Sequence, residues 1–509
     1  MALVGQGSAP PAQIAQFRSD GITAATGLRI PFFTDAFARS FGFPQVLPVN
    51  MLIEETPLRE ERPFAAYVGL REVHYSRPGL VGYRGFASGP VRGVWKAPLA
   101  FGGGLIVVCG QEAYYGETGQ SLGTIPGSDL ARFAASEQQM VIVADGQAFV
   151  STGGDFAPIV SAVLPPVSDV AWLGGRFVYL AAGTDTFWYS EIDDGTNILG
   201  LDFATAEQFP DPNVAFGVLN DGLVIFGAWS TEFWQVSSDL NAPYTPTVGN
   251  TYRRGCIARD TVRFADNALI WVGDDLVVYR TGQVPTRISS SSIEDAIRRC
   301  ADPTTMTALV LQFEGHELYV LNIPGVGSYA YDFSRIGTQA QAYGDSYQRG
   351  EWQEWRSWGA DHFRGQVGCM LNGVAYVGDD TLPTLWTMQM GVYDDAGGPL
   401  ERGGSCFIKV EEGTPRCLNL VLHGVLGTGN ATEPGQSPVV EMRWSDDQGR
   451  TFTPWRAASL GAQGQYRNRP FWQRLGLLRA PGRLVQVRCT DPVNFALSHM
   501  ELNAVGPAR

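Results

Sequence analysis

Residues 105–115 read Leu-Ile-Val-Val-Cys-Gly-Gln-Glu-Ala-Tyr-Tyr, which is an apolar run, a tight turn and a return segment rich in aromatic side chains. The pattern recurs before residue 390. The seven apolar runs are 105–109, 140–143, 177–180, 223–226, 269–272, 318–321 and 374–377, and their starts lie 35, 37, 46, 46, 49 and 56 residues apart. Repeats of this size and content predict a β-propeller.

The turns of these repeats favour β-hairpins. Asn220-Asp221-Gly222, Asn372-Gly373, Gly174-Gly175 and Glu314-Gly315 lie where the chain must reverse. Two-residue hairpin turns need positive φ, which Gly and Asn tolerate best. The apolar runs are too short for a helical repeat and do not alternate, so we expect strands covered on both faces, as inside a propeller blade.

We divide the chain into three parts. Residues 1–60 lack the repeat and are rich in Gly and Pro, so we predict an extended N-terminal arm that docks on a neighbouring subunit, with a short helix near residues 34–40. Residues 61–395 form the propeller, with seven blades, or six if one hairpin is an insert. Strands near 67–75 and 81–86 are expected to complete the outer edge of a blade. Residues 400–509 hold about six or seven expected strands, with apolar and polar side chains alternating at 418–422 and 484–488, and predict a β-sandwich.

One helical interruption is expected inside the propeller. Residues 293–299 follow four serines, and Ser292 with Asp295 resembles a capping box. A serine run before a helix is more often a cap than a nucleophile.

The composition excludes several classes of protein. Of 509 residues, 44% are hydrophobic and 17% charged, which indicates a folded chain. The net charge is −14 and no Lys/Arg run stands out, so the chain lacks the signature of a nucleic-acid binder. The start MALVGQGSAP is no signal peptide, and no apolar stretch is long enough for a transmembrane helix.

The seven cysteines and five histidines show no paired spacing. Scattered cysteines in odd number suggest buried free thiols made in a reducing compartment. Nothing in their spacing argues for a metal site. We assign no catalytic, cofactor-binding or metal-binding residue.

Two local motifs carry candidate functions. Residues 445–452, Ser-Asp-Asp-Gln-Gly-Arg-Thr-Phe, resemble the Asp-box of sialidases and other glycan-handling propellers, in which Asp447 and Gly449 would stabilise a hairpin. Trp352, Trp355 and Trp358 are spaced so that they either stack on sugar rings or, more commonly, pack between blades or at a subunit interface. The single box is best interpreted as a structural hairpin.

Several segments resemble one protein family when taken in order. They are 47–51 (Leu-Pro-Val-Asn-Met), 255–258 with 264–266, 278–283 leading to 288–294, and 471–476 followed by 485–493, and residues 444–452 also fit. These segments resemble the packaged-DNA-stabilisation proteins, the tail hub or nozzle proteins of short-tailed (podovirus-type) bacteriophages. We single out Leu47, Pro48, Val49 and Asn50 as candidate assembly residues, with the three tryptophans, Asp447 and Gly449.

The resemblance implies a structural virion protein made in the bacterial host cytoplasm. Six copies would form a ring below the portal and its adaptor, near a needle or plug and fibres or spikes. The ring would extend the channel, retain packaged DNA and pass it during ejection without specific binding. An acidic lumen would repel phosphate and let DNA slide. The resemblance implies no enzyme, no cofactor and no membrane insertion.

Two other functions stay open at this point. The Asp-box and the tryptophans are also compatible with a glycan-cleaving propeller hydrolase, or with a non-catalytic carbohydrate-binding adhesin. A fold alone does not decide among the three, because propellers serve many functions.

Overall fold

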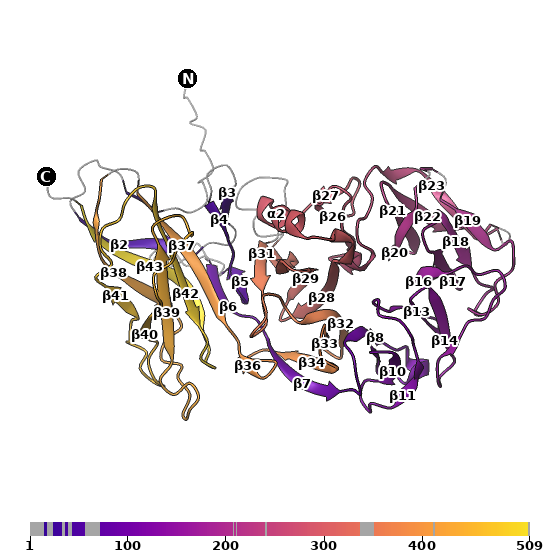
Figure 1. Cartoon of the computed structure of the whole chain (residues 1–509), viewed down its shortest axis with the longest axis horizontal. Helices are drawn as coiled ribbons and strands as arrows, with labels where there is room; N and C mark the ends of the chain where they lie inside the picture. The colour runs from indigo at the N-terminus through magenta and orange to yellow at the C-terminus, as the bar shows by residue number, and fades with distance from the viewer. Residues whose placement is uncertain are drawn as a thin grey trace, which may run out of the picture. The chain divides into compact units, whose positions relative to one another are not determined.

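The structure is a computed structural model that describes residues 15–17, 24–32, 36–38, 43–55, 72–206, 208–209, 211–239, 242–335, 351–410 and 413–506. By internal packing the chain divides into two compact units (Figure 1). We call residues 81–336 and 360–389 the propeller unit, and residues 1–80, 337–359 and 390–509 the sandwich unit.

The described residues of the propeller unit build seven small sheets that follow one another along the chain. The first three sheets contain β8 (Val91–Lys96), β9 (Leu105–Cys109), β10 (Glu112–Tyr115) and β11 (Ser121–Thr124); β12 (Arg132–Ala135), β13 (Met140–Ala144), β14 (Gln147–Ser151) and β15 (Ala157–Pro158); and β16 (Val167–Leu173), β17 (Arg176–Ala181), β18 (Thr186–Tyr189) and β19 (Phe203–Thr205). The fourth and fifth contain β20 (Asn213–Leu219), β21 (Gly222–Gly227), β22 (Thr231–Val236) and β23 (Tyr244–Tyr252); and β24 (Arg263–Ala265), β25 (Ala268–Val272), β26 (Val278–Arg280) and β27 (Thr286–Arg287). The sixth contains β28 (Thr307–Phe313), β29 (His316–Ile323) and β30 (Gly327–Asp332), and the last contains β32 (Gly365–Leu371), β33 (Val374–Asp379) and β34 (Thr384–Gln389).

The predicted apolar runs are confirmed as strands, and each is the second strand of its sheet: β9, β13, β17, β21, β25, β29 and β33. Every residue of β9, β13, β17 and β25 is buried. This burial explains why these strands read as continuous apolar runs, because neighbouring sheets cover both of their faces. We interpret each sheet as one blade.

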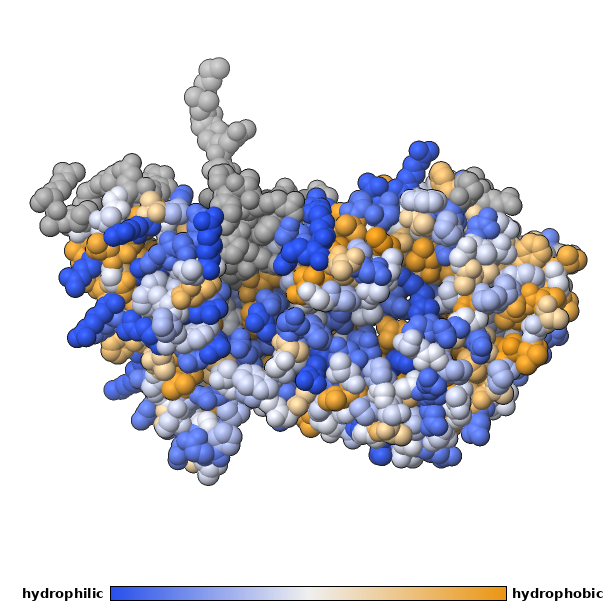
Figure 2. All heavy atoms as spheres, viewed as in Figure 1, coloured by the Kyte–Doolittle hydropathy of each residue, from blue (hydrophilic) through white to orange (hydrophobic). Residues whose placement is uncertain are grey.

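The sheets close into a ring. Shared apolar clusters join the first sheet to the second, the second to the third, the third to the fourth and the fourth to the fifth. Another cluster joins the first sheet to the last through Val91, Val94, Leu105, Val107, Val367, Leu371 and Leu385. The last sheet is completed by β7 (Gly79–Gly85), which lies next to β34, as expected for residues 81–86. On the outer surface, hydrophobic side chains gather over β18 and β19 (Figure 2).

Helix α2 (Ser291–Arg299) is confirmed, but its predicted cap is wrong. The residue before the first turn is Ser290, and Ser292 lies inside the helix, where its hydroxyl meets that of Ser290 at 2.7 Å. Short 3-10 turns occur at η2 (Leu99–Phe101), η3 (Arg259–Thr261), η4 (Pro303–Thr305) and η5 (Phe333–Arg335).

The sandwich unit contains two larger sheets. One has the order β1-β37-β42-β39-β40, with β1 (Ala15–Phe17), β37 (Arg402–Val410), β42 (Gly482–Cys489), β39 (Val439–Ser445) and β40 (Arg456–Ser459). The other has the order β41-β38-β43-β6-β5, with β41 (Phe471–Gln473), β38 (Arg416–Gly424), β43 (Ala496–Val505), β6 (Glu72–Ser76) and β5 (Met51–Glu55), and β2 (Ala24–Pro31) also pairs with β43. Shorter strands are β3 (Ala36–Ala38), β4 (Phe43–Val46), β31 (Glu351–Trp355), β35 (Asp394–Asp395) and β36 (Gly398–Pro399).

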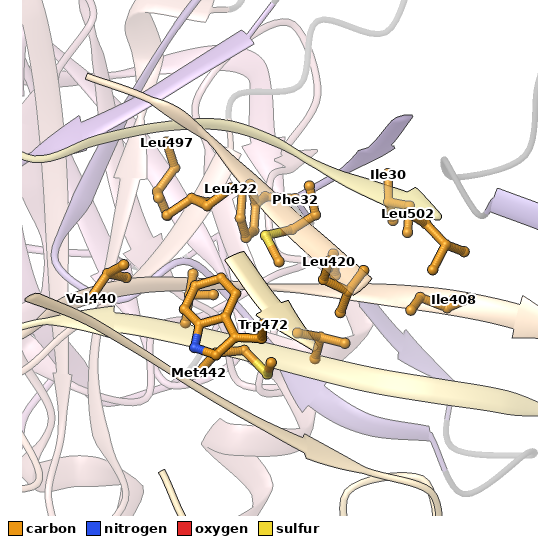
Figure 3. Packing of buried hydrophobic residues seen from close by; sticks show 14 of the residues in the cluster. Ile30, Phe32, Ile408, Leu420, Leu422, Val440, Met442, Trp472, Leu497 and Leu502 are labelled. Carbon is orange, nitrogen blue, oxygen red and sulfur yellow. The ribbon is translucent and has the colours of Figure 1, made fainter. Parts of the chain in front are cut away.

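The core of the sandwich includes residues from the N-terminal part of the chain. Ile30 and Phe32 are buried in one cluster with Leu420, Trp472 and Leu502 (Figure 3). Residues 72–76, which we expected at the edge of a blade, instead pair with β5 and β43, while residues 67–71 lie outside the described part.

The N-terminal residues differ from expectation in a second respect. The helix expected near residues 34–40 is wrong, because Ala36–Ala38 is strand β3, paired with β4; the other residues of that stretch lie outside the described part. The expectation failed because a short strand takes its conformation from its partner. The three-part division of the chain stays a proposal, since packing groups the described N-terminal strands with the sandwich.

Candidate assembly site

A buried asparagine organises the segment 47–50. Asn50 is 0% exposed and has a φ of 54°, a left-handed conformation that Asn tolerates better than most residues. Its side-chain amide donates to the carbonyl oxygens of Arg356 (2.9 Å) and Glu401 (2.8 Å). Its Oδ1 accepts from the Arg356 backbone N–H (3.0 Å) and from Arg77 Nε (2.8 Å). One side chain therefore joins three segments that lie far apart in sequence.

Arg77 completes this polar cluster. Its guanidinium, almost fully buried, lies 3.1 Å from Asp395 Oδ1 and stacks 5.3 Å from the Trp355 ring centroid. Asp395 Oδ2 accepts from the Trp358 backbone N–H at 2.9 Å. Burial lowers the pKa of Arg77, and the charge of Asp395 opposes that shift. A buried charge needs such a partner, because an unpaired one is strongly destabilising. We call Asn50, Arg77, Trp355 and Asp395 the buried knot.

Backbone hydrogen bonds attach the same segment to its neighbours. Val49 exchanges two backbone bonds with Gly403, of 3.0 and 3.1 Å, and the Glu354 N–H donates to the Pro48 carbonyl at 2.9 Å. A Cβ on Gly403 would collide with the carbonyl oxygen of Val487, so only glycine fits there. Pro48 and Val49 are therefore held through their backbone, whereas Asn50 is held through both its backbone and its side chain.

The structure brings together seven of the nine candidate residues. Leu47, Pro48 and Asn50 are buried and Val49 is half-buried, and residues 48–50 lie beside β31, the strand that carries Trp352 and Trp355. Trp352 and Trp355 are buried and cannot stack on a sugar, whereas Trp358 is 48% exposed and packs against Gly398. A role of these residues in assembly stays a prediction.

Asp447 and Gly449 lie apart from the knot, in the turn between β39 and β40. Asp447 accepts hydrogen bonds from the Thr451 N–H (2.8 Å), the Thr451 hydroxyl (2.6 Å) and the Ser445 hydroxyl (2.7 Å). These bonds, led by that of the Thr451 side chain, hold the pKa of Asp447 well below its usual range. Gly449, at a φ of 87°, donates its N–H to the Ser445 hydroxyl at 2.7 Å. The carboxylate is occupied by its own turn, as a structural box requires.

Sequence reasoning missed Arg77, Asp395 and Arg402. Arg402 is buried, donates to the Val493 carbonyl at 2.7 Å and lies 4.7 Å from the Tyr393 ring centroid. No local spacing marks such residues, because their partners come from other segments. The sequence offers one signal for a buried arginine, which is its position beside an apolar strand. Many surface arginines have the same position, so this signal does not identify the buried ones.

The propeller unit contains a partly open central cavity of about 510 Å³. It is lined mainly by the first strands of the sheets, with aromatic walls that include Trp95 and Phe133, whose rings stack at 5.9 Å. Two arginines line it, and the lining contains no Asp or Glu. Arg132 is paired with Asp169 through bonds of 2.8 and 3.0 Å. Most glycoside hydrolases use a pair of carboxylates, which this lining does not offer.

Reactive groups are scarce in the part of the chain that the structure describes. No cluster of His, Cys, Asp and Glu there is able to hold a metal ion. All seven cysteines are free, and burial raises the pKa of Cys109 to about 11 and of Cys256 to about 12, which disfavours the nucleophilic thiolate. No described helix has the length and apolar character needed to span a bilayer.

Known proteins similar to this chain include solved structures and a curated relative. The solved structure of BBS1N in complex with ARL6DN, soaked with mercury, has a TM-score of 0.40 at 10% identity, over 62% of this chain and 97% of that chain. Hsv2 of Kluyveromyces lactis has a TM-score of 0.35 at 8% identity, over 64% and 95%. The tail hub protein gp10 of Salmonella phage P22 is 23% identical over 241 residues, which is 43% of this chain and 50% of that relative. The chain thus aligns with half the length of this curated relative.

Two family models match the chain in the order of its units. A model described as Bacteriophage P22 Gp10, beta-propeller, matches residues 29–393, and one described as Bacteriophage P22 Gp10, beta-sandwich, matches residues 406–505. The predicted propeller and sandwich are confirmed by these matches, which leave the number of blades open. The first match alone covers more than half of the chain. This chain therefore belongs to the family of phage P22 Gp10, the tail hub and packaged-DNA-stabilisation proteins of the phage tail.

Proposed function

We propose that this chain is a structural hub or nozzle of a short phage tail, which extends the portal-adaptor channel, helps retain packaged DNA and passes it during ejection. The observation that carries the proposal is the pair of family matches over residues 29–393 and 406–505. Its partners are further copies of itself, in a ring of six, together with the portal or adaptor, a needle or plug, and a fibre or spike. It acts without catalysis, cofactor or membrane insertion.

The physical character of the propeller supports a structural role. A closed ring of sheets with shared apolar clusters is a rigid wall element. The central cavity has no carboxylate pair, so the hydrolase alternative lacks its usual machinery. With Trp352 and Trp355 buried, the carbohydrate-binding alternative loses two of its three stacking candidates.

The net charge of −14 suits a channel that DNA must slide through. An acidic lumen repels phosphate, so DNA would pass without specific binding. A channel-facing surface that proves net basic would contradict this idea, as would lumen Asp→Lys or Glu→Lys variants that eject DNA normally.

Electron microscopy of the purified chain and of virions tests the main proposal. We expect the purified chain to form six-fold rings and virions to carry a nozzle at the tail. Particles that lack this chain should have no nozzle and should leak DNA after packaging. A monomer that is absent from virion tails would overturn the proposal. Release of reducing sugar from host polysaccharide would instead favour the hydrolase, and glycan binding without turnover the adhesin.

The predicted arm, residues 1–60, is proposed to contact a neighbouring copy or the adaptor. A deletion of residues 1–45 would also remove Ile30 and Phe32 from the sandwich core. A deletion of residues 1–14 is the cleaner test, since it spares every described strand. It should leave both units folded and prevent joining to tails; normal assembly would contradict the proposed role of the arm.

A further inference from the structure

The second half of the sandwich carries an arginine-rich stretch. Residues 448–490 contain eight arginines and no Asp, Glu or Lys, in a chain whose net charge is −14. Two of them have acidic partners: Arg483 binds Asp446 at 2.6 and 2.9 Å, and Arg488 binds Glu441 at 2.8 Å. The stretch is therefore only partly neutralised by the sandwich itself.

The exposed arginines concentrate in residues 463–481, which we call the basic segment. Arg467, Arg469, Arg474 and Arg479 are exposed there, and none forms an ion pair with any residue that the structure describes. Strongly hydrophilic side chains project from the surface over β38, β40 and β41 in Figure 2. This segment presents uncompensated positive charge on an otherwise acidic protein.

The basic segment also exposes apolar side chains. Tyr466 is 67% exposed, Phe471 53% and Leu477 47%. Phosphate contacts alone would leave such side chains in water, whereas the cores of protein interfaces are enriched in Tyr, Phe and Arg. The composition of the segment favours a protein partner over a nucleic acid.

The propeller unit contains a matching acidic region. Residues 177–252 hold ten acidic residues and no Lys, Arg or His. Within it, the connection between β18 and β19 (residues 190–202) and the first residue of β19 form what we call the acidic loop. The loop includes the carboxylates Glu191, Asp193, Asp194 and Asp202. It also exposes Ile192 (56%), Leu199 (51%), Leu201 (85%) and Phe203 (43%).

We propose that the basic segment of one copy of this chain docks on the acidic loop of a second copy. This inference rests on the proposed function, because it names the contact that builds the ring. Opposite charges steer the two surfaces together, and the exposed apolar residues on both would be removed from water. Since the two surfaces are different, the contact is head-to-tail, and repetition of such a contact builds a ring where the rotation between copies closes.

The first test reverses charge in the basic segment. Arg467→Glu with Arg479→Glu should weaken self-association roughly 10- to 100-fold, because two attractions become repulsions. The control carries the same charge change on exposed propeller arginines outside the acidic loop, Arg253→Glu with Arg299→Glu, and should associate like the parent. Analytical ultracentrifugation measures both, and thermal melting checks that each variant is folded. Wild-type association should also weaken as salt rises.

The second test mixes two defective chains. A loop variant, Asp193→Asn with Leu201→Ser, keeps an intact basic segment and introduces no positive charge that could attract a reversed segment. The Arg467→Glu, Arg479→Glu variant keeps an intact acidic loop. At a concentration where each variant alone is monomeric, the mixture should form dimers but no rings. The intact basic segment of one variant docks on the intact acidic loop of the other, and the second contact of each chain is defective. A mixture that stays monomeric while the parent forms rings would overturn the inference.

The other outcomes are also decisive. Rings that form equally well with all variants would refute this contact and leave the proposed function standing. A DNA duplex bound by the parent and released by the basic-segment variant, with rings unaffected, would assign the segment to DNA and refute the docking. A parent chain that neither associates nor enters tails would refute the proposed function itself.

Discussion

Removing the charge of Asp395 should destabilise the sandwich unit through the buried knot. In Asp395→Asn the side chain can still accept a hydrogen bond from the Trp358 N–H. The buried Arg77 guanidinium, however, loses its ion pair with the Asp395 carboxylate, whose Oδ1 lies 3.1 Å from it. Breaking a buried pair by neutralising one partner costs about 3–5 kcal/mol. A domain of this size loses roughly 2–4 °C per kcal/mol, so the melting temperature should fall by about 6–20 °C.

A partly exposed ion pair provides the matched control. Arg280 and Asp266 lie 2.7 Å apart with side chains 30% and 33% exposed. Pairs in contact with solvent contribute about 0–1 kcal/mol, so Asp266→Asn should shift melting by only a few degrees. Since Asp266 has a positive φ that Asn tolerates, the change adds no backbone strain.

Hydrogen exchange locates the effect and a double mutant tests its cause. The amides of Asn50 and Glu354 donate within the knot region and should exchange at least about 100-fold faster in Asp395→Asn. Adding Arg77→Met to Asp395→Asn removes the stranded charge, so the double variant should lose less than the two single variants combined, by about 0.5–3 kcal/mol. A melting temperature within about 2 °C of the parent, or strict additivity, would refute the reasoning.

Three further predictions concern single positions. Gly403→Ala should destabilise the sandwich unit by about 1–3 kcal/mol, measured by urea unfolding, because its Cβ meets a carbonyl oxygen of β42. The hydrogen bond that His362 donates to Asp380 raises the pKa of His362 to about 9. The stabilisation from this bond is fully present below pH about 6.5 and is lost as pH rises through about 9, so His362→Gln should remove that alkaline loss in a pH series of melting temperatures. Trp355→Ala should cost about 3–5 kcal/mol and Trp358→Ala clearly less, since Trp358 is half exposed, and equal losses would contradict the difference in burial.

Local patterns were sufficient to predict the strands of the propeller and of the sandwich. The run at 105–109 coincides with β9, and the six or seven strands expected after residue 400 correspond to β37 to β43. Turn residues at positive φ, such as Asn220 and Gly373, were equally readable. These predictions succeed because a strand covered on both faces must be apolar throughout, and a tight reversal must use residues that tolerate positive φ.

Long-range pairing escaped prediction. Asn50 is visible in the sequence as part of a family-like segment, but its bonding partner Arg356 lies 306 residues away. Residues 24–31 were expected in an arm and residues 72–76 at the edge of a blade, but both form strands that pair with β43. Neither segment has a sequence pattern that reveals this pairing. Partner choice depends on which sheet edge is left open once the rest has folded, and a single strand does not record that.

The sequence by itself determined the class of fold, the positions of the strands and the family, because short-range periodicity, turn chemistry and ordered segments are written in neighbouring residues. It also held the unequal distribution of charge between residues 177–252 and 448–490, which the net total conceals. Only the tertiary structure decided that Asn50, Arg77, Trp355 and Asp395 meet in one buried knot, and which arginines face solvent without a partner. Burial and pairing of charge depend on the distances between segments remote in sequence, and folding alone sets those distances.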